Sequence, residues 1–239
     1  MRRTLTATGT IAVAASLALT GCSGGGKKKS DAAASAAANP AAMLATAKKT
    51  LDETAGVHFK LTSQKVPDKA TGLLSGEGDG SHAPAFKGSI KVQVPVAGAV
   101  DVPVVAVNGK VWAKTPLTPK MAQVDPKQFG APDPAKIFAT EGGFSSLLTA
   151  TQKPKFGDKT RSGKDVVQTV TGTLPGTIVK KNLTIGVEAE TYDTTYLITD
   201  SGELRSATLT GQFYSQSTDT SYTVELTKYG EQVTVSPPS

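Results

Sequence analysis

The spacing of apolar residues changes from a helical to a strand-like period near residue 55. Apolar residues recur at helical spacing between 43 and 51, and Asn39-Pro40 before them offers a helix cap followed by a first-turn proline. From residue 57 the apolar positions alternate, in the segments 57–62 and 86–94. The glycine-rich segment 72–80 lies between them. We therefore predict a helix followed by three strands.

Asn108-Gly109 separates two short apolar runs and predicts a two-residue hairpin turn of type I′. One face of this hairpin would carry Val105, Val107 and Trp112, and the other Val104, Ala106, Val111 and Ala113. Apolar residues on both faces indicate a strand pair that is covered, at least in part, on each side.

The middle of the chain has a different pattern. Asp125-Pro126 and Asp133-Pro134 each combine a cap with a first-turn proline, which predicts short helices. An apolar stripe follows over 137–148, interrupted at Gly142-Gly143, and its plainest interpretation is ordinary core. Further strands are predicted at 166–172, 191–199, 207–213 and 222–226, with 233–235 closing the sheet, and a short helix or turn at 174–181. About ten antiparallel strands with grouped helices indicate an α+β fold.

The N-terminus has the features of an export signal. Two arginines precede a short apolar run at 11–19, which is too short to span a bilayer, and Leu19-Thr20-Gly21-Cys22 follows directly. This tetrapeptide resembles the bacterial lipobox, and Cys22 is the only cysteine of the chain. We therefore expect a signal peptide over 1–21 and a lipid anchor on Cys22 at the outer face of the cell membrane. The alternative is an ordinary signal beside a stray cysteine.

Residues 22–38 have the composition of a flexible tether, which would leave a single domain over 39–239. Lysines 27–29 would attract anionic headgroups or simply keep the tether soluble. The net charge of +6 comes mostly from this N-terminal part, because the residues after 31 sum to about +2. We therefore expect no nucleic-acid partner.

The sequence offers little chemistry for catalysis. His58 and His82 have no metal-ligand spacing to another histidine or to a cysteine. The segment 157–165 differs from a phosphate-binding loop in spacing and in its last residue. No Gly-x-Ser-x-Gly elbow occurs. We therefore expect no enzyme activity, no catalytic residue, no metal and no cofactor.

Several segments together resemble the LppX/LprG lipoproteins of mycobacteria and other actinobacteria. They are GVHFKL at 56–61, VAVNGKVW at 105–112, DP at 133–134 with GGFSSLL at 142–148, LITDSG at 197–202 and YGEQVTV at 229–235. The resemblance implies a half-barrel similar to the LolA and LolB carriers, in which one strongly curved antiparallel sheet wraps helices around an apolar cavity.

The resemblance also implies a function. Members bind acylated lipids or glycolipids, of the phosphatidylinositol mannoside, lipoarabinomannan or triacylglycerol type, and help move them towards the cell surface. A membrane lipid transporter is a further partner that it implies. Exposing a sixteen-carbon chain to water costs on the order of 13 kcal/mol, so a carrier needs a dry cavity.

Candidate cavity residues come from the sheet and from the inserted helices. They are Ile90, Val92, Val105, Ile137, Phe138, Phe144, Leu147 and Leu148. The alternative is that these side chains fill an ordinary core. The chain would then be a structural or interaction lipoprotein, or a sensor or chaperone for an exported partner.

Overall fold

The computed structural model describes residues 39–238, apart from 96, 117, 130 and 216–218. The predicted signal peptide, the tether and Cys22 lie outside the described residues. The predicted first helix is present as α2 (Pro40–Glu53), and the Asn39 side chain accepts a hydrogen bond from the Ala41 amide at 2.9 Å.

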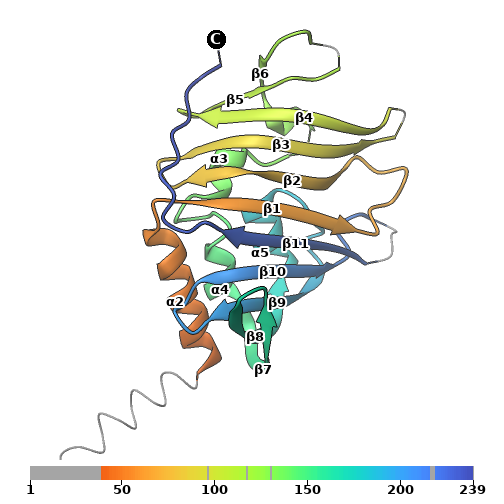
Figure 1. Cartoon of the computed structure of the whole chain (residues 1–239). Coiled ribbons are helices and arrows are strands. Elements are labelled where there is room, and N and C mark those ends of the chain that lie inside the picture. The colour runs from red at the N-terminus through yellow and green to blue at the C-terminus, as the bar shows by residue number, and fades with distance from the viewer. Residues whose placement is uncertain (1–38, 96, 117, 130, 216–218, 239) are drawn as a thin grey trace, which may run out of the picture.

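The strands form a single antiparallel sheet with the order β6-β5-β4-β3-β2-β1-β11-β10-β9-β8-β7 (Figure 1). Their bounds are β1 Gly56–Gln64, β2 Gly72–Ser81, β3 Ala85–Val94, β4 Gly98–Val107, β5 Lys110–Ala113, β6 Ala122–Val124, β7 Gln152–Ser162, β8 Asp165–Pro175, β9 Thr191–Thr199, β10 Leu204–Gly211 and β11 Thr220–Thr227. The sheet is open, because β6 and β7 are its two edges. This confirms the α+β class with one curved antiparallel sheet.

The strand order divides the sheet into two halves. The chain starts at β1 in the centre and proceeds strand by strand to the edge at β6. The segment 125–151 then crosses to the opposite edge, and β7 to β11 return towards the centre, where β11 pairs with β1. The crossing segment contains the helices inserted midway, so it lies against both halves.

The short helices are η1 (Pro126–Phe129), α3 (Pro134–Ile137), α4 (Ser146–Ala150) and α5 (Gly176–Leu183). α3, α4 and α5 lie behind the sheet in Figure 1. α4 contacts both α2 and α5, while α3 contacts β3 and β4. The Asp133 carboxylate caps α3 by accepting from the Ala135 amide at 3.0 Å, as its sequence predicts.

The turn between β4 and β5 confirms the predicted hairpin. Asn108 and Gly109 have φ angles of 55° and 70°, and a type I′ turn requires positive φ at both positions. Val104 pairs with Ala113 and Val105 pairs with Trp112, so the two faces of the hairpin are the predicted ones.

Three features differ from the sequence prediction. Residues 233–235 form no strand, because β1 already has β2 and β11 as neighbours. The tail instead crosses the start of β1, where the Gly230 amide donates to Gly56 O at 3.1 Å. β7 and β6 were not predicted. β7 is mostly exposed on both faces and lacks apolar alternation, and β6 has only three residues.

Candidate functional site

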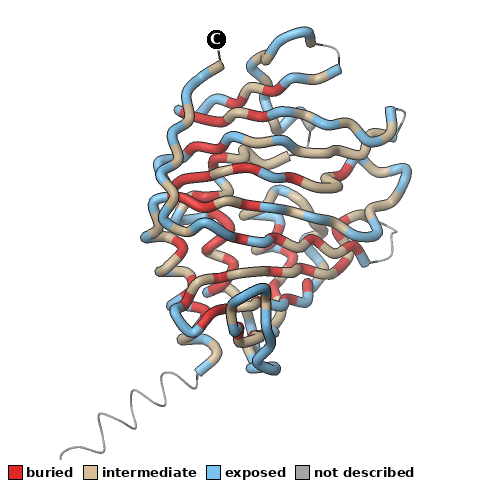
Figure 2. Tube along the Cα trace, in the orientation of Figure 1, coloured by how far each residue is buried: buried red, intermediate tan, exposed pale blue. Residues whose placement is uncertain are grey.

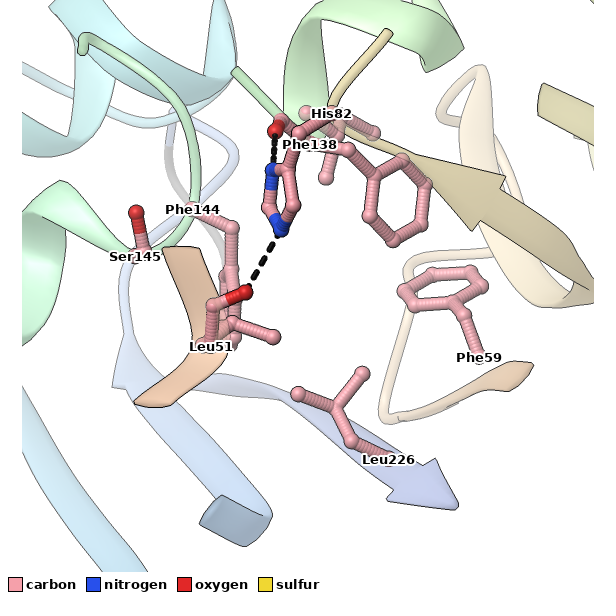
Figure 3. A pocket seen from close by; sticks show the side chains of 8 residues that line it. Leu51, Phe59, His82, Phe138, Phe144, Ser145 and Leu226 are labelled. Carbon is pink, nitrogen blue, oxygen red and sulfur yellow. Dashed lines mark hydrogen bonds between the residues drawn. The ribbon is translucent and has the colours of Figure 1, made fainter. Parts of the chain in front are cut away.

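An apolar pocket lies between the helical layer and the central strands (Figure 3). Its lining side chains are Leu51, Phe59, His82, Ile137, Phe138, Phe144, Ser145 and Leu226. The free volume is about 10 Å³. That volume is close to the minimum that holds one water molecule, so the side chains fill almost all of this interior.

Three phenylalanines fill one side of the pocket. The Phe59 ring meets the rings of Phe86 and Phe138 edge to face, with centroids 6.4 Å and 5.9 Å away, and Phe86 stacks on Phe138 at 6.2 Å. The Phe138 ring lies directly over the backbone of β2 at Gly80. A Cβ on Gly80 would be 2.3 Å from Phe138 Cε2, so the ring needs a glycine beneath it.

His82 connects the helical layer across the top of this pocket. Its Nε2 lies 2.5 Å from Leu51 O at the end of α2, and its Nδ1 contacts Phe138 O at the end of α3 (Figure 3). A ring nitrogen donates only when it carries a proton, so a neutral imidazole satisfies one of these carbonyls and an imidazolium both. Lys48 makes a second connection, because its Nζ bonds Asp52 and donates to Thr140 O at 2.9 Å.

A second, larger pocket opens beside the first. It lies between the β5–β6 hairpin, the segment from η1 to α3 and the end of α5, and its volume is about 460 Å³. Ile137 lines both pockets, so its side chain lies at the boundary between the apolar interior and the open groove. The groove lining mixes lysines and capping aspartates with apolar side chains such as Val111, Val124 and Ile137.

The structure places seven of the eight predicted cavity residues on the inner side of the sheet, in three environments. Ile137, Phe138 and Phe144 line the apolar pocket, and Leu147 and Leu148 are buried in the adjoining core. Ile90 and Val92 lie on the inner face of β3, where they pair with Val102 and Val100 and remain half-buried.

Val105 does not belong with this group. It pairs with Lys87 and Trp112, while its neighbours Val104 and Ala106 are buried on the inner face. Because adjacent strand residues point to opposite faces, Val105 lies on the outer face of the sheet, which corrects its assignment to the cavity.

Sequence reasoning missed five lining residues: Leu51, Phe59, His82, Ser145 and Leu226. Three of them occupy regular apolar positions of α2, β1 and β11, so their periodicity marks them as inward-facing but does not bring them together. His82 carries no periodic signal, because it follows the last residue of β2 in a turn.

The opposite end of the interior is closed by tyrosines. Tyr192 Oη donates to Gln212 O at 2.7 Å, and the hydroxyls of Tyr214 and Tyr222 lie 2.6 Å apart. Burial raises the pKa of the phenol in every tyrosine of the chain, namely Tyr192, Tyr196, Tyr214, Tyr222 and Tyr229. These groups therefore remain neutral hydrogen-bonding partners at ordinary pH.

Within residues 39–238 and outside the small gaps, no group of three or more His, Cys, Asp or Glu side chains has the arrangement of a metal site. In the same part of the chain, no helix combines the length and apolar character needed to cross a bilayer.

An open antiparallel sheet with helices along one face and an apolar interior between the layers defines a half-barrel protein. The sequence profile of the LppX_LprAFG lipoprotein family matches residues 39–235. The chain belongs to this family.

Solved structures show the same fold. LprF from Mycobacterium bovis superposes with a TM-score of 0.70 at 17% identity, over 84% of this chain and 97% of that one. The lipoprotein LppX of Mycobacterium tuberculosis gives a TM-score of 0.60 at 17% identity, over 82% and 97% of the two chains. A comparison with curated protein sequences gives no significant match.

Proposed function

We propose that this lipoprotein binds the acyl chains of a lipid between its helical layer and its sheet, and carries them through the aqueous part of the envelope. The observation that carries this proposal is the continuous apolar interior under an open sheet, lined by Phe59, Ile137, Phe138 and Phe144, in a chain of the LppX_LprAFG family. The proposed carrier needs no catalytic residue, metal or cofactor.

Binding requires the interior to open, because a free volume of about 10 Å³ is far below the several hundred Å³ of ordinary ligand pockets. The elements that would move are α3 and α4, which have four and five residues. They contact the rest of the protein through side chains and isolated hydrogen bonds, whereas the strands are held by continuous ladders. Displacing them therefore breaks no sheet hydrogen bond.

The energy of the bound chain would offset the cost of opening. Each methylene removed from water contributes about 0.8 kcal/mol, so two acyl chains would replace the apolar packing that Phe138 and Phe144 give up when they move aside. Ile90 and Val92 are half-buried on the inner face, so they offer apolar surface that an acyl chain would cover. We include both in the proposed lining, together with Ile137, Phe138, Phe144, Leu147 and Leu148.

The lipid on Cys22 would hold this domain close to the bilayer from which it collects its cargo. We propose transfer towards the cell surface, with a glycolipid or another acyl lipid as cargo and a membrane lipid transporter as partner. Two or three acyl chains on one residue would make the attachment effectively permanent.

One observation favours a second candidate function. The apolar pocket is filled by the protein's own side chains, as expected for a structural or interaction lipoprotein whose interior never opens. The two candidates differ in a single measurable property, which is the uptake of acyl chains.

Mass spectrometry under native conditions tests the proposal on the chain with Cys22→Ser, which removes the covalent lipid. The expected result is a non-covalently bound acyl lipid after purification, or uptake of a fluorescent diacyl lipid from vesicles. If neither is observed, the filled-core alternative stands.

Two matched variants locate the uptake. Ile137→Trp places a larger side chain between the apolar pocket and the groove and is expected to reduce lipid uptake several-fold. Val105→Trp makes a similar change on the outer face and is expected to leave uptake unchanged. Equal effects of the two substitutions would contradict the proposed position of the site.

A further inference from the structure

The open groove of about 460 Å³ gathers four lysines from four different elements. Lys110 begins β5, Lys127 lies in η1, Lys136 lies in α3 and Lys181 lies in the last turn of α5. All four side chains are exposed. Among the described residues, none has a carboxylate oxygen within 4.0 Å of its ammonium nitrogen.

Two aspartates also line the groove, but both are engaged with the backbone. Asp125 Oδ1 accepts from the Lys127 amide at 3.0 Å, and Asp133 Oδ1 accepts from the Ala135 amide at 3.0 Å. The groove therefore keeps a net charge of two positive units. Lysines without an ion pair, such as Lys60 and Lys87, also occur elsewhere on the described surface. What distinguishes the groove is that four lysines and only two carboxylates line one pocket.

The groove and the apolar pocket share one boundary. Ile137 lines both, and the next residue towards the N-terminus, Lys136, faces the groove. A molecule that crosses this boundary meets apolar surface on one side and ammonium groups on the other. An amphiphile with acyl chains and an anionic headgroup has this distribution of polarity. The volume of the groove also falls in the range of small-ligand sites.

We infer that this lysine groove binds the phosphate group of the cargo lipid, with Lys110, Lys127, Lys136 and Lys181 as its ligands. Lysine is a point-charge ligand for phosphate, and several lysines converging on one anion add their attraction. This inference rests on the proposed function, because the acyl part of the same lipid occupies the interior beyond Ile137. The groove would make the protein prefer anionic over neutral acyl lipids, and the apolar interior alone cannot give this preference.

The test compares two lipids with identical acyl chains, phosphatidylglycerol and diacylglycerol, each offered in phosphatidylcholine vesicles to the chain with Cys22→Ser. The expected result is preferential uptake of phosphatidylglycerol. In the triple variant Lys127→Gln, Lys136→Gln, Lys181→Gln this preference is expected to fall by roughly tenfold, because three ionic contacts that are each weak at an exposed site are lost together. Diacylglycerol uptake should stay unchanged.

A charge-matched control removes three lysines from other surfaces: Lys60→Gln, Lys87→Gln and Lys155→Gln. These residues are exposed on β1, β3 and β7 and lie outside the groove. The control has the same net charge as the groove variant, so it is expected to keep the lipid preference. If both triple variants lose the preference equally, general attraction to the vesicle explains it and the groove assignment is overturned.

Two further outcomes separate this inference from the proposed function. If the protein with its groove lysines intact takes up both lipids equally, the inference is overturned and the carrier function stands. If it takes up neither lipid, the inference and the proposed carrier function are both overturned. A last arm measures inorganic phosphate and glycerol 3-phosphate by calorimetry. If either binds as tightly as the lipid, the groove is a site for a free phosphate compound and the lipid assignment is overturned.

Discussion

The two halves of the sheet have very different inner faces. On β9, the inward positions Tyr192, Thr194, Tyr196 and Ile198 are at most 2% exposed. On β3 the inward positions Ile90 and Val92 remain half-buried. In Figure 2, β3 and β4 are red at one end, where Phe86, Val104 and Ala106 are buried, and largely tan along the rest of their length.

The residues that fill each half explain the difference. The half from β8 to β11 uses tyrosines and large aliphatic side chains, and the tyrosine hydroxyls are hydrogen-bonded at its rim. The half from β2 to β4 has glycines at inward positions of β2, including Gly76 and Gly80, so little side chain projects from that strand. The half from β8 to β11 is therefore filled by its own side chains. In the other half Phe138 packs on Gly80, but Ile90 and Val92 stay half-buried, and these two are the residues that the proposed ligand would cover.

The largest expected effect concerns the tyrosine-filled half. Burial raises the pKa of all five phenols above their ordinary value of 10.0. In the unfolded chain the phenols would ionise near pH 10, whereas the fold keeps them neutral. The stability that the buried phenols contribute is therefore fully present below pH 10 and is lost as the pH rises above it. We expect the tyrosine absorbance change near 295 nm to coincide with the loss of circular dichroism. Ionisation of most tyrosines in a still folded protein would contradict this.

Truncation of one aliphatic side chain in each half compares the two directly. Ile198→Ala removes a fully buried side chain and is expected to lower the free energy of unfolding by about 2–5 kcal/mol. Ile90→Ala makes the same change at a half-buried position, and about 1–2 kcal/mol is expected. Urea denaturation measures both. Equal losses would show that the inner face of β3 is as well packed as that of β9.

Two glycines of β2 sharpen the description of the open half. Gly80→Ala would bring a methyl group into the Phe138 ring, and we expect a loss of about 1–3 kcal/mol with displacement of that ring. Gly76→Ala is the control on the same strand, because its nearest neighbour, Ile90 Cγ2, would be at 3.4 Å. A change within about 0.5 kcal/mol is expected there. Thermal unfolding and the near-ultraviolet spectrum report the two effects.

The two histidines give the smallest expected effect. His82→Ala removes the connection between Leu51 O and Phe138 O and is expected to lower stability by about 1–2 kcal/mol. It should also speed hydrogen exchange of the Phe144 amide, which bonds Ile137 O at 2.8 Å in the same segment. His58→Ala removes contacts to Asp79 and Glu77 on the outer face, for which at most about 1 kcal/mol is expected. Unchanged exchange in His82→Ala would show that α3 is held by other contacts.

Much of the fold follows from local signals that the sequence displays. Asn39-Pro40 and Asp133-Pro134 begin helices, because the Asn or Asp side chain accepts a hydrogen bond from a first-turn amide and the proline fixes φ. Asn108-Gly109 forms the turn, because these two residues accept positive φ angles. β7 was not predicted because its exposed residues lack alternation, and the tail at 233–235 alternates without pairing. In both cases the available pairing partner, and not the local pattern, decided the structure.

The candidate site shows the same division. Ile137, Phe138 and Phe144 were predicted from the apolar stripe and do line the pocket. Val105 was assigned to the wrong face, since a strand that is apolar on both sides does not reveal which side meets the core. Periodicity fixes which residues share a face, but only the packing of helices on the sheet fixes which face is inside.

The sequence by itself determined most of the element types, the hairpin turn, the family and the expectation of a lipid on Cys22, because these depend on neighbouring residues. Only the tertiary structure brought Lys110, Lys127, Lys136 and Lys181 to one groove and set Ile137 between that groove and the apolar pocket. The physical reason is that these residues come from separate elements, and their meeting depends on the crossing of the helical segment behind the completed sheet.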